Sequence, residues 1–200
     1  MKNGSKKNML VIVGGPGSSG ATTIAKMLSE HLNLERVYAG GVFRQKVMDL
    51  GYKSLEEFYF LATQEMFFDI DREVDAYLIE KAKQGNVLLD SKAFAAIATK
   101  KGIDCTVKIW LESSLPVRVK RMVGKQGDIS FFRRVFLYIS TFFNLANRRR
   151  ADGRRYMELY GVEYSKPEKY NDIVLDTSNI DEKETFNLIL EKFKDGRYFE

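Results

Sequence analysis

A glycine-rich stretch near the N-terminus, GGPGSSGATT (Gly14–Thr23), constrains this chain more than any other segment. It follows an apolar run, Met9–Val13, whose length and branched residues are typical of a buried strand. It leads into a helix-like segment, Thr22–His31. Glycines in such a turn let consecutive backbone N–H groups point inward, and the next helix adds its unpaired N–H groups. The sequence therefore predicts a strand, an anion-binding loop and a helix in succession.

The loop follows the phosphate-binding pattern G-x-x-x-x-G-K-[ST] from Gly15 to Thr22, but Ala21 occupies the lysine position. In that pattern the lysine reaches the outer phosphates and the hydroxyl meets Mg²⁺. Backbone groups make the anion nest, so we expect phosphate binding without the lysine; the alternative is an ordinary glycine-rich turn. The residues expected to bind nucleotide phosphates are Gly15, Pro16, Gly17, Ser18, Ser19, Gly20, Ala21, Thr22 and Thr23.

Strand-like and helix-like segments alternate along the rest of the chain. Further strands are expected at 36–39, 86–90, 106–111 and 172–176, and further helices at 42–50, 55–66, 69–84, from 116, and at 181–193. This alternation predicts an α/β fold, a P-loop NTPase-type three-layer sandwich with a central parallel sheet of about five strands. A length of 200 residues suits one domain, 1–200.

Positive charge is concentrated in one part of the chain. Eleven Lys and Arg but only two Asp lie between Arg118 and Arg155, whereas the whole chain carries +5. Such a cluster requires an anionic partner: phosphate groups, nucleic acid or acidic lipid. The single Cys105 excludes an intramolecular disulfide. Because no apolar run is long enough for a signal peptide or a membrane-spanning helix, we expect a cytoplasmic protein.

A set of ordered stretches resembles the nucleoside monophosphate kinases, and among them the archaeal-type cytidylate kinases. The stretches are GGPGSSGATTIAKML, YAGGVFRQ, SLEEF, IDREVDAYLIEKAKQGNVLLDSK, VKIWLESSLPVRVKRM, RRRADGRRYMELYG and DIVLDTS. The resemblance covers nearly the whole chain except 131–147. The resemblance implies phosphoryl transfer from Mg-ATP to CMP or dCMP, an acceptor-binding insertion at about 40–84 and a lid at about 124–147. Archaeal-type loops often read G-S-G-T-T, also without lysine.

The resemblance also implies residues for the acceptor and the metal. Arg44, in YAGGVFR, matches the arginine that holds the acceptor phosphate. Asp90 and Lys92 stand where the family carries [DE]-G-R; Lys92 keeps the charge but loses the two-pronged geometry of an arginine. Asp90 is expected at the acceptor and, with Thr22, at Mg²⁺ or its waters.

The catalytic residues implied by the resemblance are arginines and one aspartate. Arg148, Asp152 and Arg155 match the lid-side motif R-x-x-x-[DE]-x-x-R, whose arginines approach the phosphates being exchanged. Their spacing places all three on one helix face; the alternative is an exposed ladder of ion pairs. Arg121 matches a further family arginine and is expected to cover charge that develops in the transition state.

The segment Phe131–Arg150 is longer and more aromatic than an ordinary lid. Three interpretations remain open: a lid that packs on itself or a second subunit, an amphipathic segment on an acidic membrane, and a nucleic-acid surface. Together with Ala21 and Lys92, this segment also leaves a second function open, a nucleotide-binding pseudokinase whose segment 131–150 binds a partner or membrane.

Overall fold

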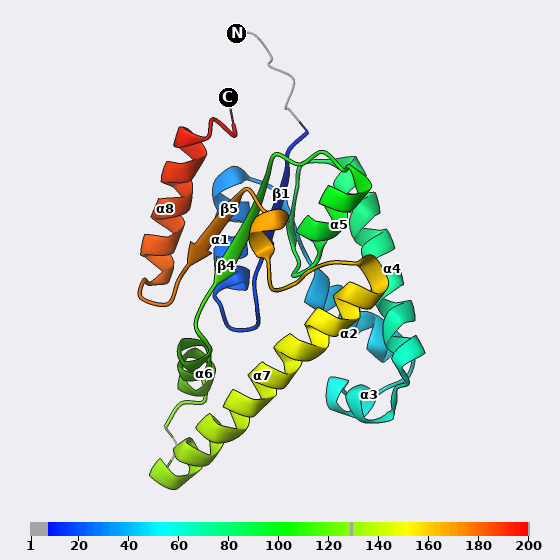
Figure 1. The fold of residues 1–200 in the computed structure, drawn as a ribbon, viewed down its shortest axis with the longest axis vertical. Helices are drawn as coiled ribbons and strands as arrows, with labels where there is room; N and C mark the ends of the chain where they lie inside the picture. Colours follow the sequence, from blue (N-terminus) through cyan, green and yellow to red (C-terminus); the bar gives the residue numbers. More distant parts are fainter. Residues whose placement is uncertain (1–7, 129, 200) are drawn as a thin grey trace.

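The computed structural model describes residues 8–128 and 130–199 as a five-stranded parallel sheet between two layers of helices (Figure 1). The N-terminal residues 1–7 and position 129 of the expected lid lie outside the described residues. The elements in chain order are β1 (Leu10–Gly14), α1 (Ala21–Leu32), β2 (Glu35–Tyr38), α2 (Ala39–Asp49), α3 (Leu55–Leu61), α4 (Gln64–Gln84), β3 (Val87–Asp90), α5 (Phe94–Lys101), β4 (Val107–Glu112), α6 (Leu115–Gly124), α7 (Phe131–Tyr160), the 3₁₀ turn η1 (Pro167–Lys169), β5 (Ile173–Asp176) and α8 (Glu182–Asp195).

The strand order is β2-β3-β1-β4-β5, and every neighbouring pair is parallel. In the central strand β1, Ile12 pairs with Leu89 of β3, and Val13 pairs with Ile109 of β4. All residues of β1 and β3 are buried, as expected of strands covered on both faces. The predicted fold class and the predicted five strands are confirmed. Since all strands run the same way, their carboxyl ends meet at one edge of the sheet.

Alternate side chains of β1 enter two separate cores. Leu10 and Ile12 pack with residues of α2, α4 and α5, whereas Val11 and Val13 pack with residues of α1 and α8. Apolar side chains on both faces of a strand require a helical layer on each face. The packing therefore gives the three-layer sandwich that the sequence predicts.

The structure differs from the sequence prediction most clearly at two helices, α3 and α5; α2 also begins earlier than expected, at Ala39, and η1 and the first half of α7 were not predicted. The helix expected at 55–66 is divided: α3 ends at Leu61, and α4 begins after Thr63, whose hydroxyl accepts a hydrogen bond from Met66 N at 3.4 Å. This is an N-cap, which starts a new helix and competes with continuation of the previous one. The short helix α5 was not predicted, because its alanines and threonine give no clear amphipathic period.

A single helix of 30 residues, α7, joins the aromatic segment to the lid-side arginine motif. Its N-terminal half extends away from the sheet, beside α6 (Figure 1). Leu145 on this half packs with Val119 and Val123 of α6 in a small separate core. The expected insertion at 40–84 comprises α2 to α4, and the expected lid comprises the α6–α7 connection and the first half of α7; their boundaries remain predictions.

The glycine-rich loop passes very close to the sheet at Gly15. A β-carbon on Gly15 would lie 2.5 Å from the carbonyl oxygen of Leu111 in β4, inside any permitted contact. At Gly17 the nearest atom to such a carbon is Leu145 Cδ2 at 3.7 Å, an ordinary contact. The backbone therefore requires glycine at the first position for space, but not at the second.

We expect Gly15→Ala to lower the free energy of unfolding by about 1–3 kcal/mol, because the added methyl forces the loop away from β4. Gly17→Ala is the matched control, and its effect should stay within about 0.5 kcal/mol. Urea denaturation of both variants measures the difference. Equal effects of the two substitutions would contradict the close approach at Gly15.

Candidate active site

The loop after β1 turns sharply before α1. Ser19 N donates to Pro16 O at 3.0 Å, and both Ser18 (φ 66°) and Gly20 (φ 99°) have left-handed backbone conformations. No acidic residue lies in the first turn of α1, and no side chain caps it. Ala21 is buried in the core under α1. The loop thus leaves the N-terminus of α1 available to an anion, and the usual lysine position packs inward.

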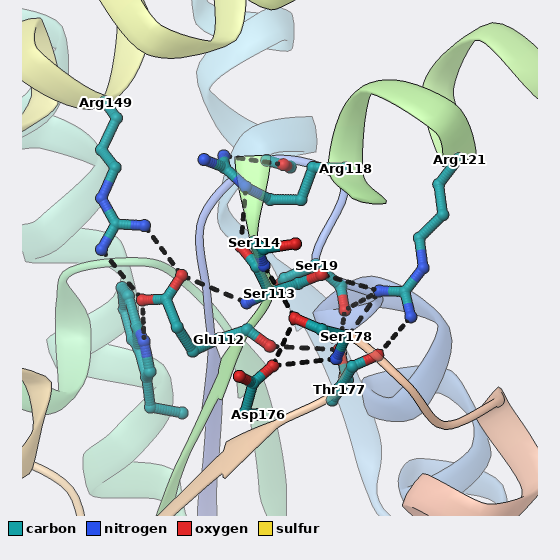
Figure 2. A network of polar contacts seen from close by, with 12 residues as sticks. Ser19, Glu112, Ser113, Ser114, Arg118, Arg121, Arg149, Asp176, Thr177 and Ser178 are labelled. Atoms are coloured by element: carbon teal, nitrogen blue, oxygen red, sulfur yellow. Dashed lines mark hydrogen bonds and ion pairs between the residues drawn. The ribbon is translucent and has the colours of Figure 1, made fainter. Parts of the chain in front are cut away.

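Two arginines of α6 bind carbonyl oxygens of the loop (Figure 2). Arg121 donates to Ser19 O at 3.0 Å, and Arg118 donates to Gly17 O at 3.3 Å. In a trans peptide the carbonyl and the next N–H point in opposite directions. These contacts therefore direct the N–H groups of Gly20 and Ser18 to the other side of the backbone, as an anion nest requires.

Arg121 was predicted to be catalytic, and the structure places its guanidinium among acceptors of the chain itself. Besides Ser19 O, it donates to Thr177 Oγ1 at 3.1 Å, to Thr177 O at 2.5 Å and to Ile180 O at 3.3 Å. Thr177 Oγ1 also donates to Ser19 O at 3.0 Å. Arg121 therefore connects the loop to the segment after β5.

Arg118 was missed by the sequence analysis. It is 3% exposed, and its Nε donates to Ser113 O at 3.1 Å. Burial lowers its pKa, and the positive charge of Arg149 contributes. Nothing in the basic run VRVKRM distinguishes an arginine that turns into the protein from one that faces solvent, so this position required the structure.

Three of the predicted site residues meet beside the loop. Lys92 Nζ, just after β3, lies 2.8 Å from the buried Asp152 Oδ2 on α7. Burial lowers the pKa of Lys92; Asp152 opposes this, and the nearby charge of Arg148 adds to it. Together with Pro16 and Gly17 of the loop, these residues line a gap of about 10 Å³; its other lining residues are Arg118, Leu145, Arg149 and Tyr164. The lid-side motif thus converges on the phosphate loop through Arg148 and Asp152.

Arg155, the third residue of the motif, turns toward α4. Its Nε forms an ion pair with Asp71 Oδ2 at 2.9 Å, and its Nη2 donates to Asp152 Oδ1 at 3.2 Å. Burial raises the pKa of Asp71 to about 6, although the charge of Arg155 opposes the shift. One turn later, Asp75 accepts a short hydrogen bond from Tyr160, and burial raises the pKa of Asp75 to about 7. These contacts fix α7 to α4.

Asp90, at the end of β3, has two different neighbours. Its Oδ2 lies 2.6 Å from Arg36 Nη2, and its Oδ1 accepts from Thr22 Oγ1 at 3.5 Å. Burial raises its pKa, although Arg36 opposes the shift. No cluster of three or more metal-ligating side chains occurs in residues 8–128 and 130–199. Mg²⁺ commonly uses one or two protein oxygens together with water and substrate phosphates, so Thr22 and Asp90 fit such an ion.

Arg44 is exposed on α2, where its guanidinium lies 5.3 Å from the centre of the Tyr38 ring. Arg44 is not among the residues around the gap beside the loop. Its predicted contact with an acceptor phosphate therefore stays a prediction.

A larger cavity of about 400 Å³ lies at the carboxyl ends of β4 and β5, against α6 and α7. Glu112 binds Arg149 there with both oxygens, at 2.7 and 2.9 Å, and also accepts from Trp110 Nε1 at 3.3 Å (Figure 2). Burial raises the pKa of Glu112, but the hydrogen bonds and charge of Arg149 outweigh it and the pKa is lowered. This pair was not predicted from the sequence. The cavity is lined by Glu112, Ser113, Ser114, Leu115, Arg118, Ala146, Arg149, Arg150 and Asp176.

Known proteins of similar sequence cover most of this chain. A family profile described as an AAA domain matches residues 13–129. Cytidylate kinase from Methanopyrus kandleri is 36% identical over 189 residues, which cover 91% of each chain. Cytidylate kinase from Methanocaldococcus jannaschii is 33% identical over 184 residues, 90% of this chain and 95% of the relative.

Solved structures of similar fold include an uncharacterized protein from Eubacterium ventriosum, with a TM-score of 0.66 at 12% identity over 93% of this chain and 98% of the other. Shikimate kinase from Acinetobacter baumannii, in complex with shikimate, has a TM-score of 0.59 at 12% identity over 96% and 95% of the two chains. At this identity the likeness shows the fold alone.

The raised pKa of Asp75 predicts a pH dependence of stability. Between its ordinary value of 3.8 and its folded value of about 7, the folded state binds more protons than the unfolded state, so stability should fall as the pH rises. Asp75→Asn keeps the acceptor for Tyr160 but cannot ionise. As the pH rises through this window, the free energy of unfolding of Asp75→Asn should increase relative to that of the native protein, by about 1.4 kcal/mol for each pH unit.

Chemical unfolding at pH values from 4 to 8 measures this difference, with Asp69→Asn on the exposed side of α4 as the matched control. A constant difference between Asp75→Asn and the native protein across the window would contradict the expected titration.

Proposed function

The chain belongs to the cytidylate kinase family, and we propose that it transfers the terminal phosphoryl group of ATP to CMP or dCMP. The observation that carries this proposal is the convergence of Lys92, Arg148 and Asp152 on the phosphate loop at Gly17. The relatives named cytidylate kinase support the same reaction, because they match about 90% of the chain. The convergence favours an enzyme over a nucleotide-binding pseudokinase.

The loop and its neighbours supply what phosphoryl transfer requires, which is positioning and stabilisation of charge. In this proposal the N–H groups between Gly15 and Thr23 bind the donor phosphates. Lys92 and Arg148 enter from the other side of the gap and supply the positive charge that Ala21 lacks. Lys92 is half-buried, where a charge stabilises a developing negative charge more strongly than in water, and Arg148 is exposed beside the gap.

Mg²⁺ accompanies ATP in this proposal and would be held by Thr22 and Asp90. When bound, the ion would neutralise part of the phosphate charge and hold the phosphates in position. Arg36 already binds one oxygen of Asp90, which leaves the oxygen that faces Thr22 for this role.

The acceptor nucleotide is proposed to bind between α2 to α4 and the carboxyl end of β3. Arg44, Asp90 and Lys92 are its proposed contacts. Arg155, which binds Asp71 and Asp152, positions the motif, and Arg121 acts by holding the loop rather than by direct contact with the transferred group. We further propose that the protein works in the cytoplasm, where both nucleotides are available.

The proposed reaction is tested by measuring ADP formation from Mg-ATP with CMP, dCMP, UMP, AMP or no acceptor. Rapid turnover with CMP or dCMP and slow turnover with the others supports the proposal. Turnover with AMP alone, or the same rate without any acceptor, refutes the assignment to a pyrimidine acceptor.

We expect Arg148→Ala to lower kcat for CMP by about 10²–10³-fold, because it removes one group that stabilises charge in the transition state. Arg154 lies on the same helix and is exposed, so Arg154→Ala is the matched control. Steady-state kinetics with CMP measure kcat for both variants. A loss of activity in the control equal to that in Arg148→Ala would show a general effect of charge and contradict the assigned role.

A further inference from the structure

The N-terminal half of α7 exposes a broad apolar surface. Phe132 and Phe136 are 84% and 71% exposed, and they continue along the helix to Ile139 and Phe143 with spacings of four, three and four. Such spacing places side chains on one face of a helix. We call this surface the aromatic face of α7; its exposed residues are Phe131, Phe132, Val135, Phe136, Tyr138, Ile139 and Phe143.

The opposite side of the N-terminal half of α7 makes the contacts that hold this half against α6. Thr141 and Leu145 are buried, and Leu137 packs into the small core with Val119 and Val123 of α6. The aromatic face is therefore not needed to hold α7 on α6. Contiguous exposed apolar patches of this kind mark interaction sites on folded proteins.

The charges on this helix indicate which partner fits. Residues 131–150 contain five arginines and no Asp or Glu. Arg133 and Arg134 are exposed at the two borders of the aromatic face, and no carboxylate in the described chain forms an ion pair with either. A second copy that used the same face would bring arginines without carboxylates to pair with them. Nucleic acid would pair with the arginines but leave aliphatic Val135 and Ile139 without a stacking role.

We propose that the aromatic face of α7 docks on the surface of a membrane that contains anionic phospholipid. Phosphate headgroups pair with Arg133 and Arg134, and the phenylalanine and isoleucine side chains enter the boundary between headgroups and acyl chains. The exposed part, 131–143, is about 20 Å of helix and lies along the surface as amphipathic helices do. No helix in the described residues is long and apolar enough to cross a bilayer, so the contact is peripheral.

Helix α3 provides a matched comparison surface with the opposite charge. Phe60 is 88% exposed, with Tyr59 and Leu61 exposed beside it, but Glu56 and Glu57 occupy the first turn of the same helix. An anionic lipid surface should repel this patch despite its aromatic side chains. The variant Phe60→Ser removes an exposed ring without affecting the proposed contact.

The test is co-sedimentation of the full chain, without nucleotide, with vesicles of phosphatidylcholine alone or mixed with phosphatidylglycerol. We expect binding to the mixed vesicles that weakens with salt. The double variant Arg133→Gln/Arg134→Gln should bind them roughly twenty-five-fold more weakly, from about fivefold for each basic residue. Phe132→Ser/Phe136→Ser should lose at least about tenfold, and Phe60→Ser should bind like the native chain.

Circular dichroism checks that the helices persist in each variant, and light scattering reports the oligomeric state. The proposal is overturned if the native chain does not bind the mixed vesicles, or if Phe60→Ser weakens binding as much as the α7 variants. It is also overturned if the face proves to be a dimer contact that Phe132→Ser/Phe136→Ser dissociates without any vesicle binding. Stronger binding to a single-stranded oligonucleotide than to the vesicles would likewise refute it. None of these measurements depends on kinase activity.

Discussion

The phosphate loop depends on how its backbone carbonyl groups are held. Ser19 O accepts hydrogen bonds from Arg121 of α6 and from Thr177 after β5, and Gly17 O accepts one from the buried Arg118. Because these oxygens are engaged on one side, the adjoining N–H groups face the other. The loop is thus shaped for an anion by residues distant in sequence, and its shape does not require a lysine at position 21.

Much of the fold and part of the site follow from the sequence, for physical reasons. Buried parallel strands are continuous apolar runs, and the glycine-rich turn has few structural alternatives, so both were predicted. The inward orientation of Arg118 and the pairing of Arg149 with Glu112 were not, because each depends on which side of α6 or α7 meets the sheet. In a basic run, the arginine that becomes buried has no local sequence pattern that distinguishes it from its exposed neighbours.

A chain of alternating charges connects three parts of the molecule. Lys92 after β3 binds Asp152 of α7, which also binds Arg155, and Arg155 binds Asp71 of α4. Removal of Asp152 would leave Lys92 without its counter-charge, and removal of Arg155 would leave Asp71 without one, which is costly. Helix α4, the central sheet and the C-terminal half of α7 are therefore held in a fixed mutual arrangement, and Arg148 lies beside the loop.

The continuity of α7 has a mechanical consequence. Its 30 residues span about 45 Å; Asp71 and Asp75 hold its C-terminal end, and Leu137 and Leu145 pack its N-terminal half on α6. A rotation of about 10° about the C-terminal end would move the far tip by about 8 Å. Because α6 is packed against that half and its arginines bind the loop, such a movement would reach the loop through α6. The long helix thus connects the aromatic rings at one end of the molecule mechanically to the backbone of the loop at the other.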